Sequence, residues 1–213
     1  MKAPPFYWRK ELSINIINRA LIKMGQPTIS STAQEPNGRL YGLVYEDVRD
    51  WLLAAHPWRF AIKRAILARD EEKPVSGFAY AYTLPSDFLT LYSFGETYKT
   101  PNLSDNIVKS DERYSIEGDK ILCDVPEKLY ITYVARVENP RQFSIWFKEA
   151  LVTKLAAEFT PRLKQSATLA KAYNEEFISY LQQAEFNNDL MTDSETMPDG
   201  SWVAIREGTS NDY

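Results

Sequence analysis

His56 is the only histidine of the chain and the first candidate for chemistry, because an imidazole exchanges protons near neutral pH. It stands directly before Pro57, within the stretch AAHPWRFAIKRA that covers residues 54–65. Catalysis by this ring would require a partner, such as a serine in a Gly-x-Ser-x-Gly turn, a paired cysteine or a second histidine. The sequence contains none of these, so we expect His56 to have a structural role.

Clustered carboxylates are the second candidate, because hydrolases that use two carboxylates need a pair of acidic side chains. The sequence has three such clusters: Glu46-Asp47 with Asp50, Asp70-Glu71-Glu72, and Glu175-Glu176. Adjacent carboxylates on a helix point to different sides, and Glu46 with Asp50 is a like-charge pair typical of a solvated helix face. A carboxylate-dependent hydrolase is therefore a less favoured alternative, which exchange of Glu46 or Asp50 would test.

The sequence does not indicate a metal or cofactor site. The single cysteine, Cys123, cannot form an internal disulfide, and no second cysteine or histidine lies near it at zinc-ligand spacing. No Gly-rich phosphate loop of the P-loop or dinucleotide type occurs. We expect a protein that is not an enzyme and has no cofactor.

Composition limits the class of protein further. The chain has 213 residues, 44% of them hydrophobic, which is enough to bury a core, and 25 basic against 29 acidic residues. A mildly acidic chain with a pI near 5.2 argues against a surface that grips phosphates. Charged residues interrupt the first twenty positions, so we expect neither a secretory signal nor a membrane span, and folding in the cytoplasm. Aromatic content of 13% is a mild indication of protein interfaces.

Two helices are predicted before the histidine. Apolar residues at helical spacing indicate helices over residues 11–24 and 40–55. The residue before a proline is pushed out of the helical region, so we expect His56 to end the second helix and Pro57 to break it. At that position an imidazolium would interact favourably with the last helix carbonyls.

The residues that follow predict a structural corner made of His56, Pro57, Trp58 and Phe60. Trp58 and Phe60 are expected to anchor this corner in the core. Large aromatic residues can form interfaces or pack in the core, and we expect core packing for Trp51, Trp58 and Trp146.

The middle of the chain predicts antiparallel sheet. Alternating bulky residues indicate strands, and Gly118-Asp119 is a two-residue hairpin signal between two of them. The expected strands cover residues 60–69, 78–84, 88–94, 114–117, 120–124 and 129–137. The polar stretch 95–112 is expected to be a long irregular excursion.

Helices return after the strands. Asn139 can cap, Pro140 suits the first helical position, and Gln142 completes a capping box. Apolar residues then predict one helix up to Thr160-Pro161 and another over residues 169–184, and periodicity is lost from residue 187 onward.

These elements predict an α+β fold: an antiparallel helical bundle built from both chain ends, with an inserted antiparallel β-sheet domain and an extended C-terminal tail. The expected parts are residues 1–57 and 139–189 for the bundle helices, 58–138 for the inserted β-rich domain, and 190–213 for the tail.

Seven segments follow one another along the chain in a characteristic order: ALIKMGQP, VRDW through HPWRFA, YTLPSDFL, YSIEGDKIL, ITYVARV, FKEAL and LAAE. In this order they resemble the tail tubular protein A and head-to-tail adaptor (connector) family of short-tailed bacteriophages. The resemblance spans about residues 10–190.

The resemblance implies a helical bundle that bears a β-rich domain and a structural role in the virion tail, after synthesis in the host cytoplasm. The implied partners are the portal protein ring, the tail nozzle protein and further copies of the chain in a dodecameric ring. DNA would pass through this ring without specific binding, and a mildly acidic surface suits such a channel. A tail-completion or baseplate protein of another ring is the alternative.

The C-terminal segment is the candidate portal-binding site. Apolar residues stand there in an otherwise polar run, a pattern typical of a segment that orders on meeting a partner. Since a C-terminal extension reaches the portal in related adaptors, we expect docking through Trp202, Val203, Ile205 and Arg206. The alternative is a tail that folds back on its own bundle.

Overall fold

The computed structural model describes residues 5–33, 37–75, 77–95, 113–126 and 128–190, and for residues 5–11 the helical backbone alone. This part of the chain has an α+β fold, as the sequence predicts, with two helices, a run of strands and then further helices. Its elements are α1 (Pro5–Lys23), α2 (Gly38–Ala55), β1 (Ile62–Ala68), β2 (Tyr80–Thr83), β3 (Phe88–Gly95), β4 (Tyr114–Glu117), β5 (Lys120–Cys123), β6 (Lys128–Ala135), the 3₁₀ helix η1 (Pro140–Gln142), α3 (Ile145–Lys164) and α4 (Ala167–Leu190).

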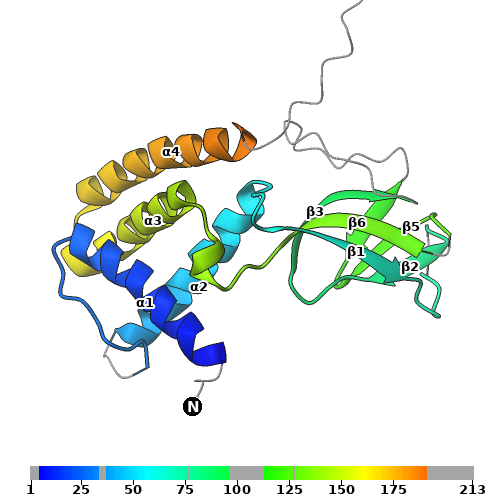
Figure 1. The fold of residues 1–213 in the computed structure, drawn as a ribbon, viewed down its shortest axis with the longest axis horizontal. Helices are drawn as coiled ribbons and strands as arrows, with labels where there is room; N and C mark the ends of the chain where they lie inside the picture. The colour runs from blue at the N-terminus through cyan, green and yellow to red at the C-terminus, as the bar shows by residue number, and fades with distance from the viewer. Residues whose placement is uncertain (1–4, 34–36, 76, 96–112, 127, 191–213) are drawn as a thin grey trace, which may run out of the picture.

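Helices from both chain ends pack into one bundle, which lies at one end of an elongated molecule (Figure 1). Its core joins residues that are distant in sequence, such as Tyr41 of α2 and Phe159 of α3, whose ring centroids are 4.9 Å apart. Lys23 at the end of α1 binds Thr153 of α3 and Glu176 of α4. None of the described helices combines the length and apolar character that a membrane crossing requires.

The strands form a β-lobe at the other end of the molecule (Figure 1). The inserted antiparallel β-sheet domain that the sequence predicts consists of two three-stranded sheets, in the orders β1-β6-β3 and β2-β5-β4. An isolated bridge between Arg69 and Tyr82 connects the two sheets, which enclose a second apolar core. The predicted hairpin is confirmed, because Gly118 has a φ of +63° between β4 and β5. Residues 96–112, predicted as an excursion, lie outside the described residues.

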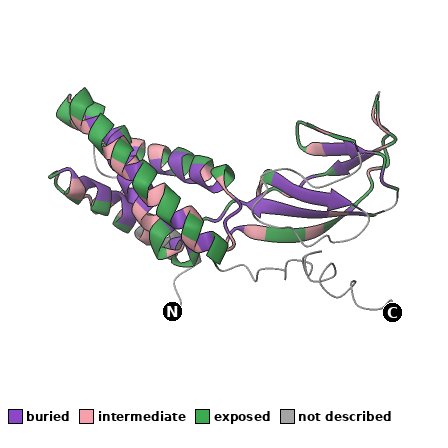
Figure 2. Cartoon of the chain, turned by 90° about the horizontal axis from the view of Figure 1, so that it is seen from above, coloured by how far each residue is buried: buried purple, intermediate pink, exposed green. Residues whose placement is uncertain are grey.

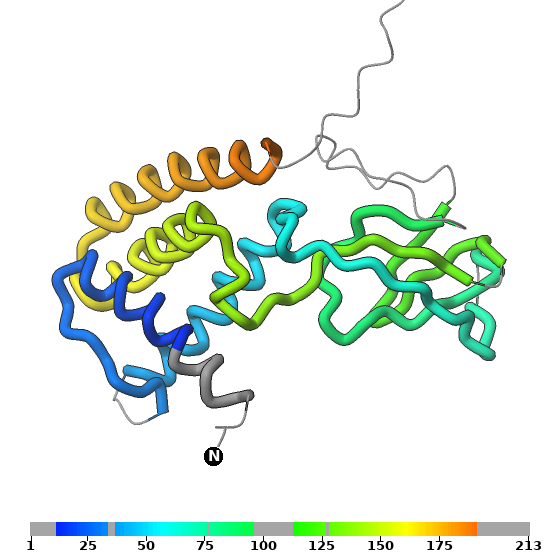
Figure 3. Tube along the Cα trace, viewed as in Figure 1, coloured from blue at the N-terminus to red at the C-terminus, as the bar shows by residue number. Residues whose placement is uncertain are grey.

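Two neighbouring chain segments join the bundle to the β-lobe (Figure 3). One leads from α2 into β1, and the other leads from β6 to η1. The amide of Ala135 donates a hydrogen bond to the carbonyl of Ala61 over 2.8 Å, so the two segments are paired where they leave the sheet. We call residues 56–61 and 136–139 the joint.

Three helix boundaries differ from the sequence prediction. α1 begins at Pro5, since proline suits the first helical positions, and α4 continues to Leu190. α3 does not stop at Thr160-Pro161 but runs on to Lys164. Because Phe159 is buried and Leu163 packs against the same core, packing on both sides of the proline outweighs the one backbone hydrogen bond that it removes.

The predicted start of α3 also needs correction. Asn139 does accept a hydrogen bond from the amide of Arg141, but it caps the short η1. Ser144 is the N-cap of α3, where its hydroxyl accepts from the amide of Phe147 over 3.2 Å. The long helix is therefore capped by Ser144, which the sequence analysis did not single out.

The three tryptophans predicted to lie in the core divide into one core residue and two surface residues. Trp58 is 0% exposed, which confirms its predicted place in the core, whereas Trp51 is 52% and Trp146 is 38% exposed, contrary to expectation. Figure 2 shows buried residues along the facing sides of the helices and exposed residues on the outer sides. Trp51 lies at the margin of the core, beside Phe177 and Lys154, because no described element covers its outer side.

Candidate functional site

His56 lies at the joint, where α2 ends. Its backbone is extended, with φ −149° and ψ 147°, in agreement with the break predicted before Pro57. Its Nε2 atom is 3.1 Å from Nδ2 of Asn188 and 3.3 Å from Oδ1 of Asp189, both at the end of α4. These two polar partners of the imidazole both belong to α4, so the ring links the end of α2 to α4.

Asn188 satisfies several polar groups of the same corner, although it is distant in sequence. Its Oδ1 accepts a hydrogen bond of 2.9 Å from the backbone amide of Arg59. Its Nδ2 approaches the His56 ring and donates to the carbonyl of Pro57 over 3.4 Å. Since Asn188 is itself buried, it pairs groups that would otherwise lose hydrogen bonds to water.

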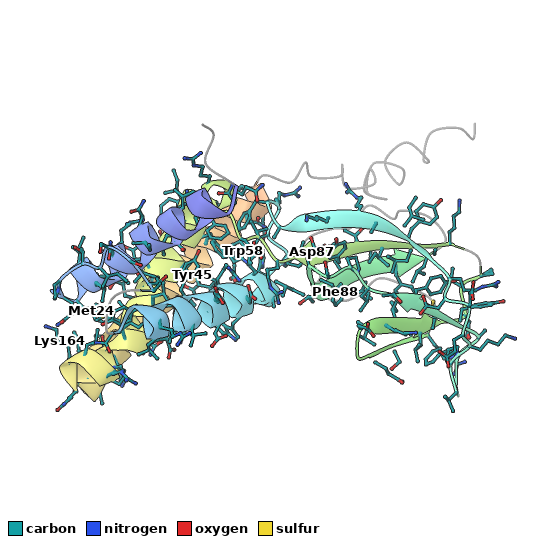
Figure 4. All side chains as sticks on the ribbon, turned by 90° about the horizontal axis from the view of Figure 1, so that it is seen from below. Met24, Tyr45, Trp58, Asp87, Phe88 and Lys164 are labelled. Atoms are coloured by element: carbon teal, nitrogen blue, oxygen red, sulfur yellow. The ribbon has the colours of Figure 1, made fainter. Side chains whose placement is uncertain are left out.

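Trp58 fixes the corner to the bundle core (Figure 4). Its ring lies 5.0 Å from that of Phe147 and 4.8 Å from that of His56. The indole Nε1 donates a hydrogen bond of 2.8 Å to the carbonyl of Leu52. That carbonyl belongs to the last turn of α2, where backbone carbonyls have no amide partner within the helix. Trp58 therefore supplies the hydrogen bond that this carbonyl would otherwise lack. Phe60 stands half-buried beside it.

Asp50 connects the bundle to the second segment of the joint. One of its carboxylate oxygens accepts from Nε of Arg49 over 2.8 Å, and the other accepts from Nε of Arg136 over 2.7 Å. Arg136 follows β6, so this ion pair joins α2 to the chain that returns from the β-lobe. The Asp50 carboxylate therefore forms ion pairs both with α2 and with the joint.

A cleft of about 500 Å³ opens beside Asp50. We call it the acidic cleft. Residues from α1, the loop between α1 and α2, α2 and the joint line it, namely Ser13, Thr32, Gly42, Tyr45, Glu46, Asp47, Arg49, Asp50, Arg136 and Glu138. Tyr45 is 2% exposed, and its hydroxyl has no hydrogen-bond partner within the described structure. A buried polar group without a partner costs about 1–3 kcal/mol. Burial also raises the pKa of Tyr45 to about 12, so the hydroxyl stays protonated.

Three members of the other two predicted acidic clusters, Asp70, Glu175 and Glu176, each lie near a different lysine. Asp70 binds Lys120 over 2.9 Å and accepts from the hydroxyl of Thr83, and the hydrogen bond from Lys120 is the largest cause that lowers the pKa of Asp70. Glu176 binds Lys23, whereas Glu175 approaches Lys171. Within the described residues, no group of three or more His, Cys, Asp or Glu side chains is arranged to hold a metal ion.

The predicted portal-binding residues, Trp202, Val203, Ile205 and Arg206, lie outside the described residues. The structure therefore brings together only the corner residues of the predicted sites. It adds three polar residues that the sequence analysis did not single out: Asn188, Tyr45 and Arg136.

A scan against protein-family models finds no match. A search of curated proteins likewise finds no match.

Proposed function

We propose that the chain is a bacteriophage head-to-tail adaptor, a structural and non-catalytic subunit of a ring between the portal and the tail nozzle. The observation that carries the proposal is the architecture: one bundle built from both chain ends, with a β-lobe inserted at a narrow joint. The ordered sequence segments that resemble the tail tubular protein A family support the same proposal.

The two-lobed shape suits a ring subunit for a physical reason. In a ring, one face of each copy meets a different face of the next copy, so the subunit needs two unlike surfaces in a fixed relative orientation. The bundle and the β-lobe are unlike in structure, and Asp50 and Asn188 tie elements together at the joint. A rigid joint would keep the orientation equal in every copy.

DNA and the portal are the partners of the proposed ring. A formal net charge of −4 at pH 7 suits a channel through which DNA slides, because acidic surfaces do not hold phosphates. Residues 191–213 carry the apolar cluster that we propose docks on the portal. The tail nozzle protein would contact the opposite side of the ring.

Sedimentation velocity tests the proposal. The purified chain would be examined alone and after mixing with the portal ring of the same bacteriophage. A large stoichiometric complex with the portal supports the adaptor function. If the chain binds no portal but joins a ring of another tail protein, a tail-completion or baseplate function replaces the proposed adaptor function.

A further inference from the structure

Helix α4 carries an apolar row on the side that faces away from the bundle. On this side Ile178 is 52%, Phe186 is 64% and Leu190 is 65% exposed. We call these three residues the outer stripe. Because they follow one another at eight and then four positions, they lie within one sector of about 120° on the helix. The buried residues of α4 lie on the opposite side and are Ala170, Phe177, Ala184 and Asn188.

The outer stripe has the character of a binding surface. Apolar side chains that are exposed singly are common on proteins, whereas aligned ones mark a surface that binds an apolar partner. Figure 1 shows α4 along the outer side of the bundle, with α3 beneath it. At 1.5 Å per residue, the outer stripe is about 18 Å long. No element of the described structure covers this length, since all three side chains are more than half exposed.

The sequence continues from the outer stripe into an apolar group of its own. Residues 191–213 follow α4 directly, and Trp202, Val203 and Ile205 stand there among polar neighbours. The tripeptide Pro-Asp-Gly at residues 198–200 comes just before this group and is typical of a turn. A turn at this place would direct the apolar group back toward α4.

Length and attachment favour this segment over a separate partner. When extended, residues 202–205 span about 10 Å, close to the distance of about 12 Å along the helix from Ile178 to Phe186. Residues 191–200 supply about 33 Å of chain, which is longer than the outer stripe. A short flexible linker gives an attached segment an effective concentration of about 1 mM. An intrinsic dissociation constant of about 0.1 mM would then keep the segment bound in a ratio of about ten to one.

We infer that the outer stripe of α4 binds residues 201–206 of the same chain. The contact covers Trp202, Val203 and Ile205, which are residues that we propose dock on the portal. A free subunit therefore keeps its docking residues covered, and the portal must displace α4 from them. This consequence rests on the proposed function, whereas the contact within the chain does not.

Trypsin measures the contact, because Arg206 lies within the bound segment. Cleavage after Arg206 releases residues 207–213, a peptide that mass spectrometry identifies. The initial rate follows the unbound fraction of the segment, so the double change Phe186→Ser with Ile178→Ser should raise it about tenfold. Leu43→Ser is the matched control, since Leu43 is 58% exposed on α2, and it should leave the rate unchanged. Circular dichroism of each full-length variant should remain that of the unmodified protein.

Crosslinking identifies the occupant of the outer stripe. The native Cys123 is buried, so cysteines introduced by Phe186→Cys and Val203→Cys would be the reactive ones. When both changes are in one chain, a short bifunctional maleimide should join them into a monomeric product at every protein concentration. A dimeric product that grows with protein concentration would show that a second copy occupies the stripe, and it would overturn the inference.

Equal cleavage rates after Arg206 in the unmodified chain and in the double variant would also overturn the inference, because the outer stripe would then protect nothing. Portal binding separates this failure from failure of the adaptor function. If both proposals hold, the double variant should bind the portal ring about tenfold more tightly, since the stripe no longer competes for the segment. Protection of Arg206 without any binding to the portal would refute the adaptor function and leave the contact standing.

Discussion

Replacement of Trp58 by alanine gives the most direct test of the joint. The side chain is fully buried and packs against the rings of His56, Phe60 and Phe147. Its indole also donates to the carbonyl of Leu52. Trp58→Ala would therefore leave a cavity and an unpaired helix carbonyl at the same time.

The magnitude follows from these two losses. Truncation of a buried tryptophan to alanine costs about 3–5 kcal/mol of unfolding free energy. A net hydrogen bond contributes about 1 kcal/mol, so Trp58→Phe, which keeps a ring but loses the donor, should cost about 1–2 kcal/mol. Domains are typically stable by about 5–15 kcal/mol, so the alanine variant should remain folded but lose a large share of its stability.

Urea unfolding followed by far-ultraviolet circular dichroism measures this effect, because the helices supply most of the signal. With a slope of about 2–3 kcal/mol per molar urea, Trp58→Ala should lower the unfolding midpoint by about 1–2 M. Trp51→Ala is the matched control, since Trp51 is half exposed and contacts only the margin of the core. Its cost should be about 1 kcal/mol or less. Equal and small shifts for Trp58 and Trp51 would refute the assignment of Trp58 to the core of the joint.

Four further changes test other parts of the structure. His56→Gln should lower the free energy of unfolding by less than about 1 kcal/mol and leave assembly intact, since glutamine keeps a polar group near Asn188. Asn188→Ala should lower it by about 2–3 kcal/mol in urea unfolding, because the change leaves buried polar groups unpaired. The Lys120 hydrogen bond lowers the pKa of Asp70, so the native state favours the carboxylate and loses that stabilisation when the carboxylate is protonated. Asp70→Asn should therefore lower the free energy of unfolding at neutral pH, and its difference from the unmodified protein should vanish as the pH falls below about 4. Measuring the urea unfolding midpoint of both proteins across an acid titration tests this. Deletion of residues 191–213 should abolish binding to the portal ring in sedimentation while the circular dichroism spectrum stays helical, and retained binding would exclude the tail as the docking segment.

Local patterns in the sequence predict the order of the elements well. Periodicity locates the helices and most of the strands, and Pro57 marks the end of α2 because a proline restricts the preceding backbone wherever it occurs. Pro161 shows the limit of such rules. Its effect on α3 depends on tertiary packing of the residues around it, which a local pattern does not contain.

The polar links of the joint are harder to predict, because they join residues that are far apart in sequence. Asn188 lies 129 positions from Arg59, and Asp50 lies 86 positions from Arg136. No spacing rule relates such pairs. The prediction that Trp51 lies in the core is wrong for a similar reason. The sequence shows that Trp51 lies on the apolar stripe of α2, but whether another element covers it depends on how the helices pack.

The contribution of Asp50 and Arg136 to the joint concerns orientation more than stability. Ion pairs that remain partly exposed contribute only about 0–1 kcal/mol, and Arg136 is partly exposed. Yet the two carboxylate oxygens of Asp50 bind Arg49 on α2 and Arg136 on the returning segment, which restricts how the β-lobe can rotate about the bundle. In a closed ring the same angle is repeated in every copy, so a small error in each joint accumulates around the circle. A pair with little effect on unfolding can therefore have a large effect on whether a ring closes.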